Sequence, residues 1–143
     1  MRHAAAQSAA IGASDFERPL SPVGRHEAAR SARRLAASTA SVERVLFSPA
    51  RRTSETAQIV AGELSLGTQA LVAVPALYAA TPAAIRAAIA RDHGNARVLL
   101  VVGHNPGISE LGCELGGLGS HAQLPTAGFW RRALDAHAWQ ALT

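Results

Sequence analysis

The sequence holds one cysteine, one tyrosine and no lysine, and aromatic residues make up only 4% of its 143 positions. A single cysteine excludes an intrachain disulfide and a zinc site built on cysteine ligands. With so few aromatic side chains, alanine, leucine and valine must fill the core, and the chain is long enough for one domain with such a core. We therefore expect residues 1–143 to form a single domain.

Clustered positive charge is also lacking, although the formal net charge is +4. The arginines are scattered along the chain, and no segment combines basic with aromatic residues as a nucleic-acid platform would. A composition rich in alanine and arginine without lysine is typical of a coding bias, so the charge is weak evidence for a polyanionic partner. We expect no nucleic-acid partner; steeply salt-dependent binding to unrelated duplexes would favour the opposite interpretation.

No apolar run reaches the length of a transmembrane helix, and the residues after Met1 are too weakly apolar for a secretory signal. We therefore expect no membrane partner and a cytoplasmic location. The sequence has no His-x-His, His-Glu-x-x-His or carboxylate cluster, no P-loop and no Gly-x-Ser-x-Gly. These absences predict a protein without a metal site or a cofactor. Nothing in the sequence indicates the oligomeric state.

Strand and helix signals alternate along the chain. The pairs Ser21-Pro22, Ser48-Pro49 and Thr81-Pro82 each predict a helix start, with Ser or Thr as the N-cap and Pro at the first helical position. Helices are predicted over 22–37, 49–64, 82–92 and 106–115, and strands over 45–47, 71–74, 98–102 and 127–134. Alternation of this kind predicts a three-layer α/β/α fold with a mostly parallel sheet.

Four polar residues lie where the carboxyl ends of parallel strands would meet. His104 directly follows the strongest strand signal, Arg52 lies in the first turn of a helix, and Arg2-His3 precede the whole pattern. Taken singly, each has an interpretation without function. His104 could be a structural histidine, Arg52 a solvated arginine, and Arg2-His3 a frayed terminus. Together, two guanidiniums and two imidazoles could surround a phosphate dianion, with neutral His3 as the nucleophile.

Six segments of the chain match the pattern of a known family. They are Arg2-His3-Ala4 and residues 18–24, 48–57, 77–80, 102–106 and 124–128. They occur in the family's order and over nearly the whole length. On these segments the chain resembles the histidine phosphatase superfamily, which has the phosphoglycerate-mutase-like fold, and it looks closest to the small SixA-like phosphohistidine phosphatases.

The resemblance implies a role for each candidate residue. His3 would be the phosphorylated nucleophile, and Asp15, with Glu17 behind it, is the best candidate for the acidic proton donor that larger relatives carry in an inserted segment. The Arg-x-x-x-Thr-Ala pattern aligns Arg52, and not Arg51, with the pocket arginine. The residues expected to bind the phosphoryl group or the substrate are Arg2, Arg18, Arg52, His104 and Asn105.

The function that the resemblance implies is a metal-independent phosphatase acting through a phosphohistidine intermediate. Its partner would be a phosphorylated protein, as in bacterial phosphorelays, or a small phosphorylated metabolite. The leaving group of a phosphohistidine substrate needs less acid assistance than an alkoxide does. Such a substrate suits a chain in which the acidic proton donor of the larger relatives is not found. The alternative is a non-catalytic phosphate-binding or scaffold member of the same fold.

One part of the family pattern is missing. The family has a central first strand of five or six apolar residues before Arg-His, whereas here only Met1 precedes Arg2-His3, and Ala4 replaces the usual Gly. Loss of a central strand removes inter-strand hydrogen bonds and plausibly costs several kcal/mol. The pattern therefore predicts an N-terminally truncated domain, in which Met1 is an internal methionine of a longer protein. A family member that has lost the strand is the alternative.

Overall fold

The computed structural model describes residues 1–9, 11–12, 14–38, 41–135 and 142. Its sheet consists of three parallel strands in the order β2-β1-β3. The strands are β1 (Arg44–Phe47), β2 (Leu71–Ala73) and β3 (Leu99–Val102). The parallel sheet predicted from the alternating pattern is confirmed.

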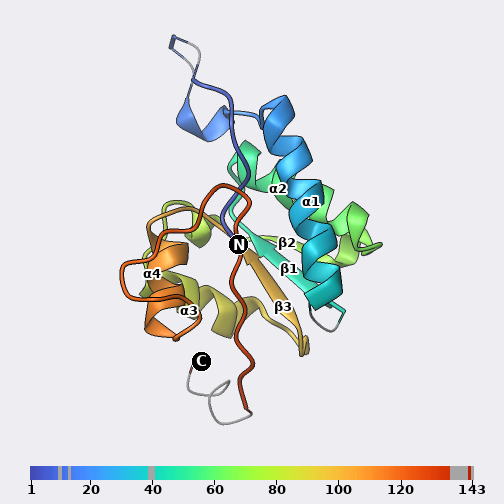
Figure 1. The fold of residues 1–143 in the computed structure, drawn as a ribbon, viewed down its shortest axis with the longest axis vertical. Helices are drawn as coiled ribbons and strands as arrows, with labels where there is room; N and C mark the ends of the chain where they lie inside the picture. The colour runs from blue at the N-terminus through green and yellow to red at the C-terminus, as the bar shows by residue number, and fades with distance from the viewer. Residues whose placement is uncertain (10, 13, 39–40, 136–141, 143) are drawn as a thin grey trace.

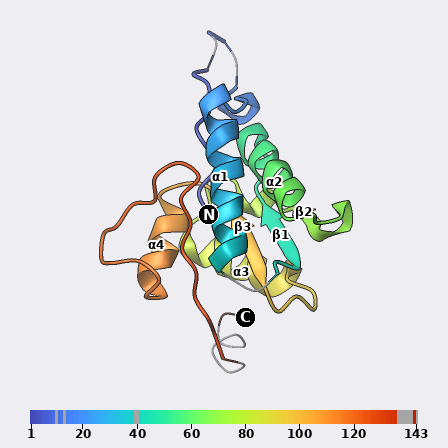
Figure 2. The ribbon, with the colours of Figure 1, turned by 45° about the vertical axis from the view of Figure 1, so that its right-hand side comes forward.

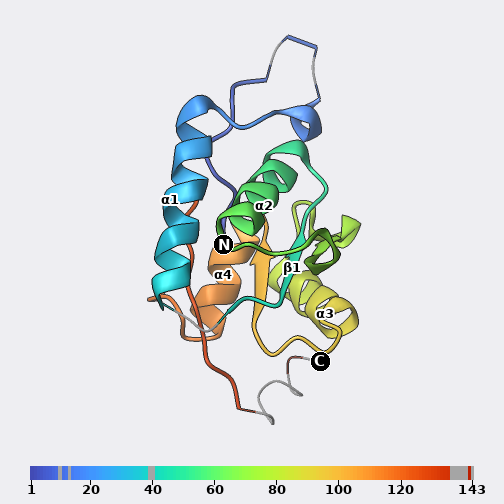
Figure 3. The same cartoon turned by 90° about the vertical axis from the view of Figure 1, so that its right-hand side faces the viewer.

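Helices cover both faces of the sheet. Figures 1 and 3 show α1 and α2 on one face and α3 and α4 on the other. The helices are α1 (Pro22–Ser38), α2 (Arg51–Glu63), α3 (Pro82–Asp92) and α4 (Gly107–Glu114), with short 3₁₀ helices η1 (Asp15–Glu17), η2 (Thr68–Ala70) and η3 (Pro75–Leu77). None of the helices in the described part of the chain is long and apolar enough to cross a membrane. The three-layer α/β/α fold is confirmed.

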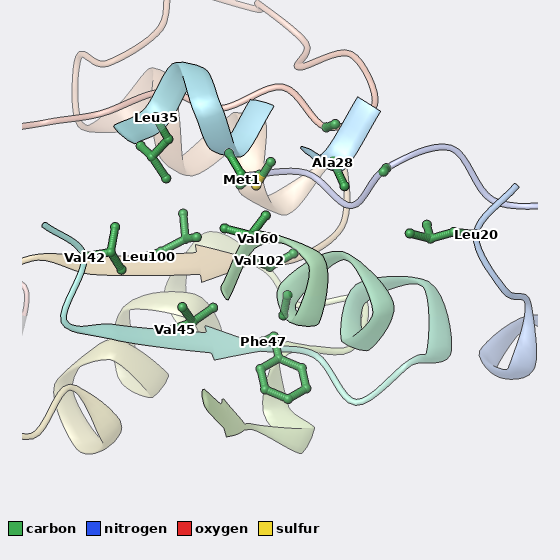
Figure 4. Packing of buried hydrophobic residues seen from close by; sticks show 14 residues of the cluster. Met1, Leu20, Ala28, Leu35, Val42, Val45, Phe47, Val60, Leu100 and Val102 are labelled. Carbon is green, nitrogen blue, oxygen red and sulfur yellow. The ribbon is translucent and has the colours of Figure 1, made fainter. Parts of the chain in front are cut away.

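The apolar residues form one cluster on each face of the sheet. Val45 and Leu100 face α1 and α2, and Figure 4 shows their side chains near Leu35, Val60 and Met1. Successive strand residues point to opposite faces, so the neighbour of Val45 joins the other cluster. That second cluster contains Leu46, Ile85, Ile89, Ile108 and Leu111. Because helices cover both faces, the carboxyl ends of the strands are where a parallel sheet of this kind binds ligands.

The first three residues lie along the end of β3. The Met1 amino group donates to the Val101 carbonyl at 2.8 Å. The Gly103 amide donates to the Met1 carbonyl, and the His3 amide donates to the Gly103 carbonyl, both at 3.0 Å. On their other side, the Arg2 amide donates to the Gly128 carbonyl at 2.9 Å. Figure 2 shows the N-terminus beside the orange-red segment that follows α4. This pairing brings His3 to the carboxyl end of the sheet.

The strand predicted over 127–134 is wrong, because the structure has no strand among the described residues after 128. The Ala127 amide donates to the His3 carbonyl at 3.1 Å, so the first two residues of the segment do pair with the N-terminus. Residues 130–135 make no backbone hydrogen bond with any described strand, so they do not extend the sheet.

The predicted capping of α2 is also wrong. Ser21 and Thr81 accept hydrogen bonds from the amides of Gly24 and Ala84, as N-caps do. By contrast, α2 begins at Arg51 with Ala50 as its N-cap and no side-chain cap bond. The Ser48 hydroxyl is directed elsewhere, into the site described next.

Candidate active site

A cavity of about 400 Å³ opens where the carboxyl ends of β1 and β3 meet the N-terminal segment. All the site residues predicted from the sequence line it, namely Arg2, His3, Asp15, Arg18, Arg52, His104 and Asn105. Tyr78 and Thr126 line it as well, although the sequence reasoning did not select them. Glu17, the second acid candidate, is exposed and is absent from the described lining.

The His3 ring is held by the backbone that follows it. Its Nδ1 lies 2.8 Å from the Ala4 carbonyl oxygen, and the Ala4 amide donates to Thr56 Oγ1 at 3.1 Å, which fixes this segment to α2. A carbonyl only accepts, so Nδ1 carries the proton. Nε2 therefore keeps its lone pair, which accepts from Arg52 Nε at 3.3 Å. The unprotonated nitrogen of His3 thus faces the cavity.

His104 follows β3 and is only 7% exposed. Its ring centroid lies 5.3 Å from that of His3, edge to face. Nε2 is 2.9 Å from the hydroxyl of Ser48, and Nδ1 is 3.3 Å from Arg52 Nη2. The two imidazoles are therefore linked through one guanidinium.

The guanidinium of Arg52, whose side chain is only 8% exposed, also contacts η1. Arg52 donates from Nη1 to the Asp15 carbonyl at 2.6 Å and from Nη2 to Asp15 Oδ2 at 2.9 Å. A buried charge needs such a partner, because an unpaired one costs several kcal/mol. Arg51 instead turns outward and pairs with Glu55 at 2.9 Å. The structure thus brings Arg52, and not Arg51, to the cavity.

Arg2 and Asn105 converge on one carbonyl oxygen. Arg2 Nη1 and Asn105 Nδ2 donate to the Leu124 carbonyl at 2.9 and 3.0 Å, and Asn105 Oδ1 accepts from Ser109 Oγ at 2.6 Å. Buried donors are almost always paired, yet Arg2 Nε has no partner in the part of the chain that the structure describes. Arg2 lines the cavity, so its guanidinium places positive charge beside any anionic ligand there.

Asp15 lies at the mouth of the cavity with its side chain 52% exposed. Its carboxylate accepts from Arg18 Nη1 at 2.9 Å and from the Tyr78 hydroxyl at 3.1 Å. The Arg18 hydrogen bond is the largest cause that lowers the Asp15 pKa, and with Arg52 and Tyr78 it brings that pKa to about 2 although burial opposes the shift. Asp15 is therefore ionised near neutral pH and has no proton to donate in this arrangement.

Both histidines are neutral near neutral pH. Burial is the main cause that lowers the pKa of His3 to about 4, and Arg52 adds to it, whereas the Ala4 carbonyl raises it. Burial also lowers the His104 pKa to about 4, with Arg52 and His3 adding to the effect and Asp15 opposing it. Because the rings are neighbours, their titrations are coupled.

Within the described residues, no group of three or more His, Cys, Asp and Glu side chains is placed to hold a metal ion. The positive charge around the cavity comes from the guanidiniums of Arg2, Arg18 and Arg52. Guanidinium groups suit the planar, paired oxygens of carboxylate and phosphate. Fold and site together define an α/β protein with a pocket at the carboxyl edge of its parallel sheet, lined by guanidiniums of the kind that suit an oxyanion.

The model of the histidine phosphatase superfamily, branch 1, matches residues 1–78, which is more than half of the chain. The chain therefore belongs to the histidine phosphatase superfamily, and its solved neighbours place it in the SixA-like branch.

Three of these neighbours are named as SixA proteins. One, described as a phosphohistidine phosphatase from Nakamurella multipartitia, is 35% identical over 80% of this chain, with a TM-score of 0.70. The protein histidine phosphatase SixA complexed with tungstate is 32% identical over 80% of this chain and 73% of its own, with a TM-score of 0.70. A SixA protein from Agrobacterium tumefaciens is 27% identical over 87% of this chain and 82% of its own, with a TM-score of 0.74.

The chain spans 62% of the length of the Nakamurella protein. No curated protein matches the chain.

Proposed function

We propose that this protein is a metal-independent phosphatase that passes a phosphoryl group from its substrate to His3 Nε2 and then to water. The observation that carries the proposal is the unprotonated His3 Nε2, which faces the cavity beside Arg52. A neutral imidazole is a good nucleophile toward phosphorus, and burial keeps His3 neutral.

In the first step, the Nε2 lone pair attacks phosphorus and the bond to the leaving group breaks. Phosphoryl transfer is catalysed mainly by positioning and by charge stabilisation around the equatorial oxygens. Arg52 can turn its Nε–H from His3 to a phosphoryl oxygen, and the Arg2 guanidinium adds positive charge to the same cavity. The His3 Nδ1–H bond to the Ala4 carbonyl stabilises the positive charge that the ring acquires.

In the second step, water attacks the phosphorus of phosphohistidine, the N–P bond breaks, and inorganic phosphate leaves. The electron pair of that bond returns to Nε2, which restores neutral His3. The proton released by the attacking water goes to phosphate or to solvent.

The substrate we propose is a phosphohistidine on a protein, with a small phosphoester as the alternative. Asp15 is the only carboxylate among the described lining residues, and Arg18 and Arg52 hold it ionised. A leaving imidazole needs little acid assistance, whereas an alkoxide needs a proton donor. The names of the SixA neighbours support the same choice. Arg18 and Asn105 are the proposed substrate contacts, and the cytoplasmic location stays a prediction.

The test is the His3→Ala variant, with His26→Ala as the matched control because His26 is an exposed histidine on α1. Hydrolysis of a phosphohistidine peptide and of an aryl phosphate should be abolished in the first variant and unchanged in the second. Undiminished turnover by His3→Ala would rule out the mechanism. Thermal stabilisation of the wild type by phosphate without any hydrolysis would instead favour the non-catalytic, phosphate-binding alternative.

A further inference from the structure

Ser48 has a buried hydroxyl that the mechanism above does not use. The residue is 0% exposed and directly follows the carboxyl end of β1. Its sequence context predicts a helix cap, yet α2 begins only at Arg51. The Ser48 hydroxyl lies 2.9 Å from His104 Nε2, and its other contact is a long one of 3.4 Å from the Ala50 amide. The shorter contact of Ser48 is therefore with an imidazole of the site.

The hydrogen bonds around His104 determine where its proton lies. Arg52 has only donors, so His104 Nδ1, which is 3.3 Å from Arg52 Nη2, must be the accepting nitrogen. A neutral imidazole has one donor and one acceptor, so Nε2 carries the proton and donates it to Ser48 Oγ.

We propose that Ser48 is a positioning residue for His104, whose hydroxyl accepts the Nε2–H bond and thereby keeps Nδ1 directed into the oxyanion pocket. The inference rests on the proposed function in that Nδ1 is the atom that would meet a phosphoryl oxygen. When an oxyanion binds, His104 takes up one proton from solvent at Nδ1, in place of the hydrogen bond that Nδ1 accepted from Arg52, and the new Nδ1–H donates a hydrogen bond to the anion. Ser48 continues to accept from Nε2, so the ring does not have to turn.

The charges that face His104 explain why such a partner matters. Arg52 from α2 and His3 from the N-terminal segment oppose protonation of the ring, whereas Asp15 from η1 favours it. The Tyr78 ring packs edge-on at 5.4 Å. A bound oxyanion would favour the imidazolium further, and Ser48 is the neutral acceptor for the second N–H bond of that cation.

The first experiment uses the wild-type protein near neutral pH. Nitrogen NMR of the imidazoles, with the His104 signals assigned from their loss in His104→Gln, reports which ring nitrogen carries the proton. We expect the Nε2–H tautomer without ligand and protons on both nitrogens when tungstate is added. An Nδ1–H tautomer in the ligand-free protein would overturn the proposal.

The second experiment compares Ser48→Ala with Thr53→Val. Thr53 is also 0% exposed and bonds the Ala50 carbonyl at 2.6 Å, so its variant loses a nearby buried hydroxyl without touching His104. Ser48→Ala should give a mixture of His104 tautomers and weaken tungstate binding about tenfold, the effect of one lost hydrogen bond. Thr53→Val should keep the tautomer and the affinity. Equal behaviour of the two variants would contradict the positioning role.

Neither readout depends on turnover. A protein that binds tungstate with the expected tautomer but hydrolyses nothing would refute the phosphatase proposal and leave the role of Ser48 intact. Normal hydrolysis by the wild type, together with an unchanged His104 tautomer in Ser48→Ala, would refute the role of Ser48 and leave the phosphatase proposal intact. If Ser48→Ala does not fold, the wild-type spectrum still tests the proposal, because an Nδ1–H tautomer of His104 without ligand would overturn it.

Discussion

Lowering the pH to about 5.5 should leave the site active, because burial keeps both histidines neutral well below the pKa of a free imidazole. A histidine with the ordinary pKa of 6.5 would be only about 9% neutral at that pH. With the pKa of His3 lowered to about 4, about 97% of the ring is neutral, a difference of roughly tenfold in competent nucleophile. The pKa of His104 is also lowered to about 4, so that ring is neutral to the same extent at pH 5.5.

The assay is kcat/KM for a phosphohistidine peptide between about pH 5 and pH 8, corrected for the titration of the substrate itself, which phosphorus NMR measures. Proton NMR of the imidazole Cε1–H signals follows the two histidines directly. A tenfold fall in kcat/KM between pH 7.5 and 5.5 that tracks a histidine titrating near 6.5 would refute the reasoning.

The same shifts predict how stability depends on pH. Because folding lowers the pKa of His3 and of His104, the neutral rings contribute stability that is fully present above pH 6.5 and is lost as the pH falls from 6.5 toward about 4. A shift of this size corresponds to at most about 3 kcal/mol for one histidine. Denaturant unfolding at pH 7.5 and 5 measures the loss, and a flat free energy of unfolding over this range would contradict it.

Two further predictions concern packing and the pocket arginine. A Cβ on Gly24 would lie 1.9 Å from the Ala5 carbonyl oxygen, whereas one on Gly62 meets nothing within 4 Å. Gly24→Ala should therefore destabilise the protein by about 1–3 kcal/mol, and Gly62→Ala should stabilise it by roughly 0.5–1 kcal/mol in denaturant unfolding; equal effects would contradict the packing. Arg52→Lys should lower kcat/KM by about 100-fold, because lysine cannot bridge both imidazoles and η1, while Arg51→Lys should leave it unchanged. A fully active Arg52→Lys would contradict the bridging role.

The sequence predicted most of the fold, because each element carries its own local signal. The strands that became β1 and β3 are short apolar runs, and the caps at Ser21 and Thr81 act within their own helices. The failures occur where a distant partner decides. Ser48 does not cap α2, because its hydroxyl lies 2.9 Å from His104 Nε2. The described residues after 128 form no strand, because they pair with none. Neither partner is visible in the local sequence.

The candidate site, like the fold, was predictable in part from the sequence. Arg52 and His104 each follow a strand of one parallel sheet, so the topology itself brings them together. The ionised state of Asp15 was not predictable, because it depends on how η1 docks against Arg52 and Arg18. Tyr78 was missed, although it lies within the Leu77-Tyr78-Ala79-Ala80 segment that carried part of the resemblance and is the only tyrosine of the chain.

The most direct test of the account is to trap the phosphorylated protein. Wild type is mixed rapidly with a phosphohistidine peptide or an aryl phosphate, quenched in base, and analysed by mass spectrometry of its peptides. We predict one acid-labile, base-stable phosphoryl group on His3, formed before phosphate is released and absent from His3→Ala. A phosphoryl group on another residue, or turnover by the wild type with no phosphorylated protein at any time, would contradict a mechanism through His3.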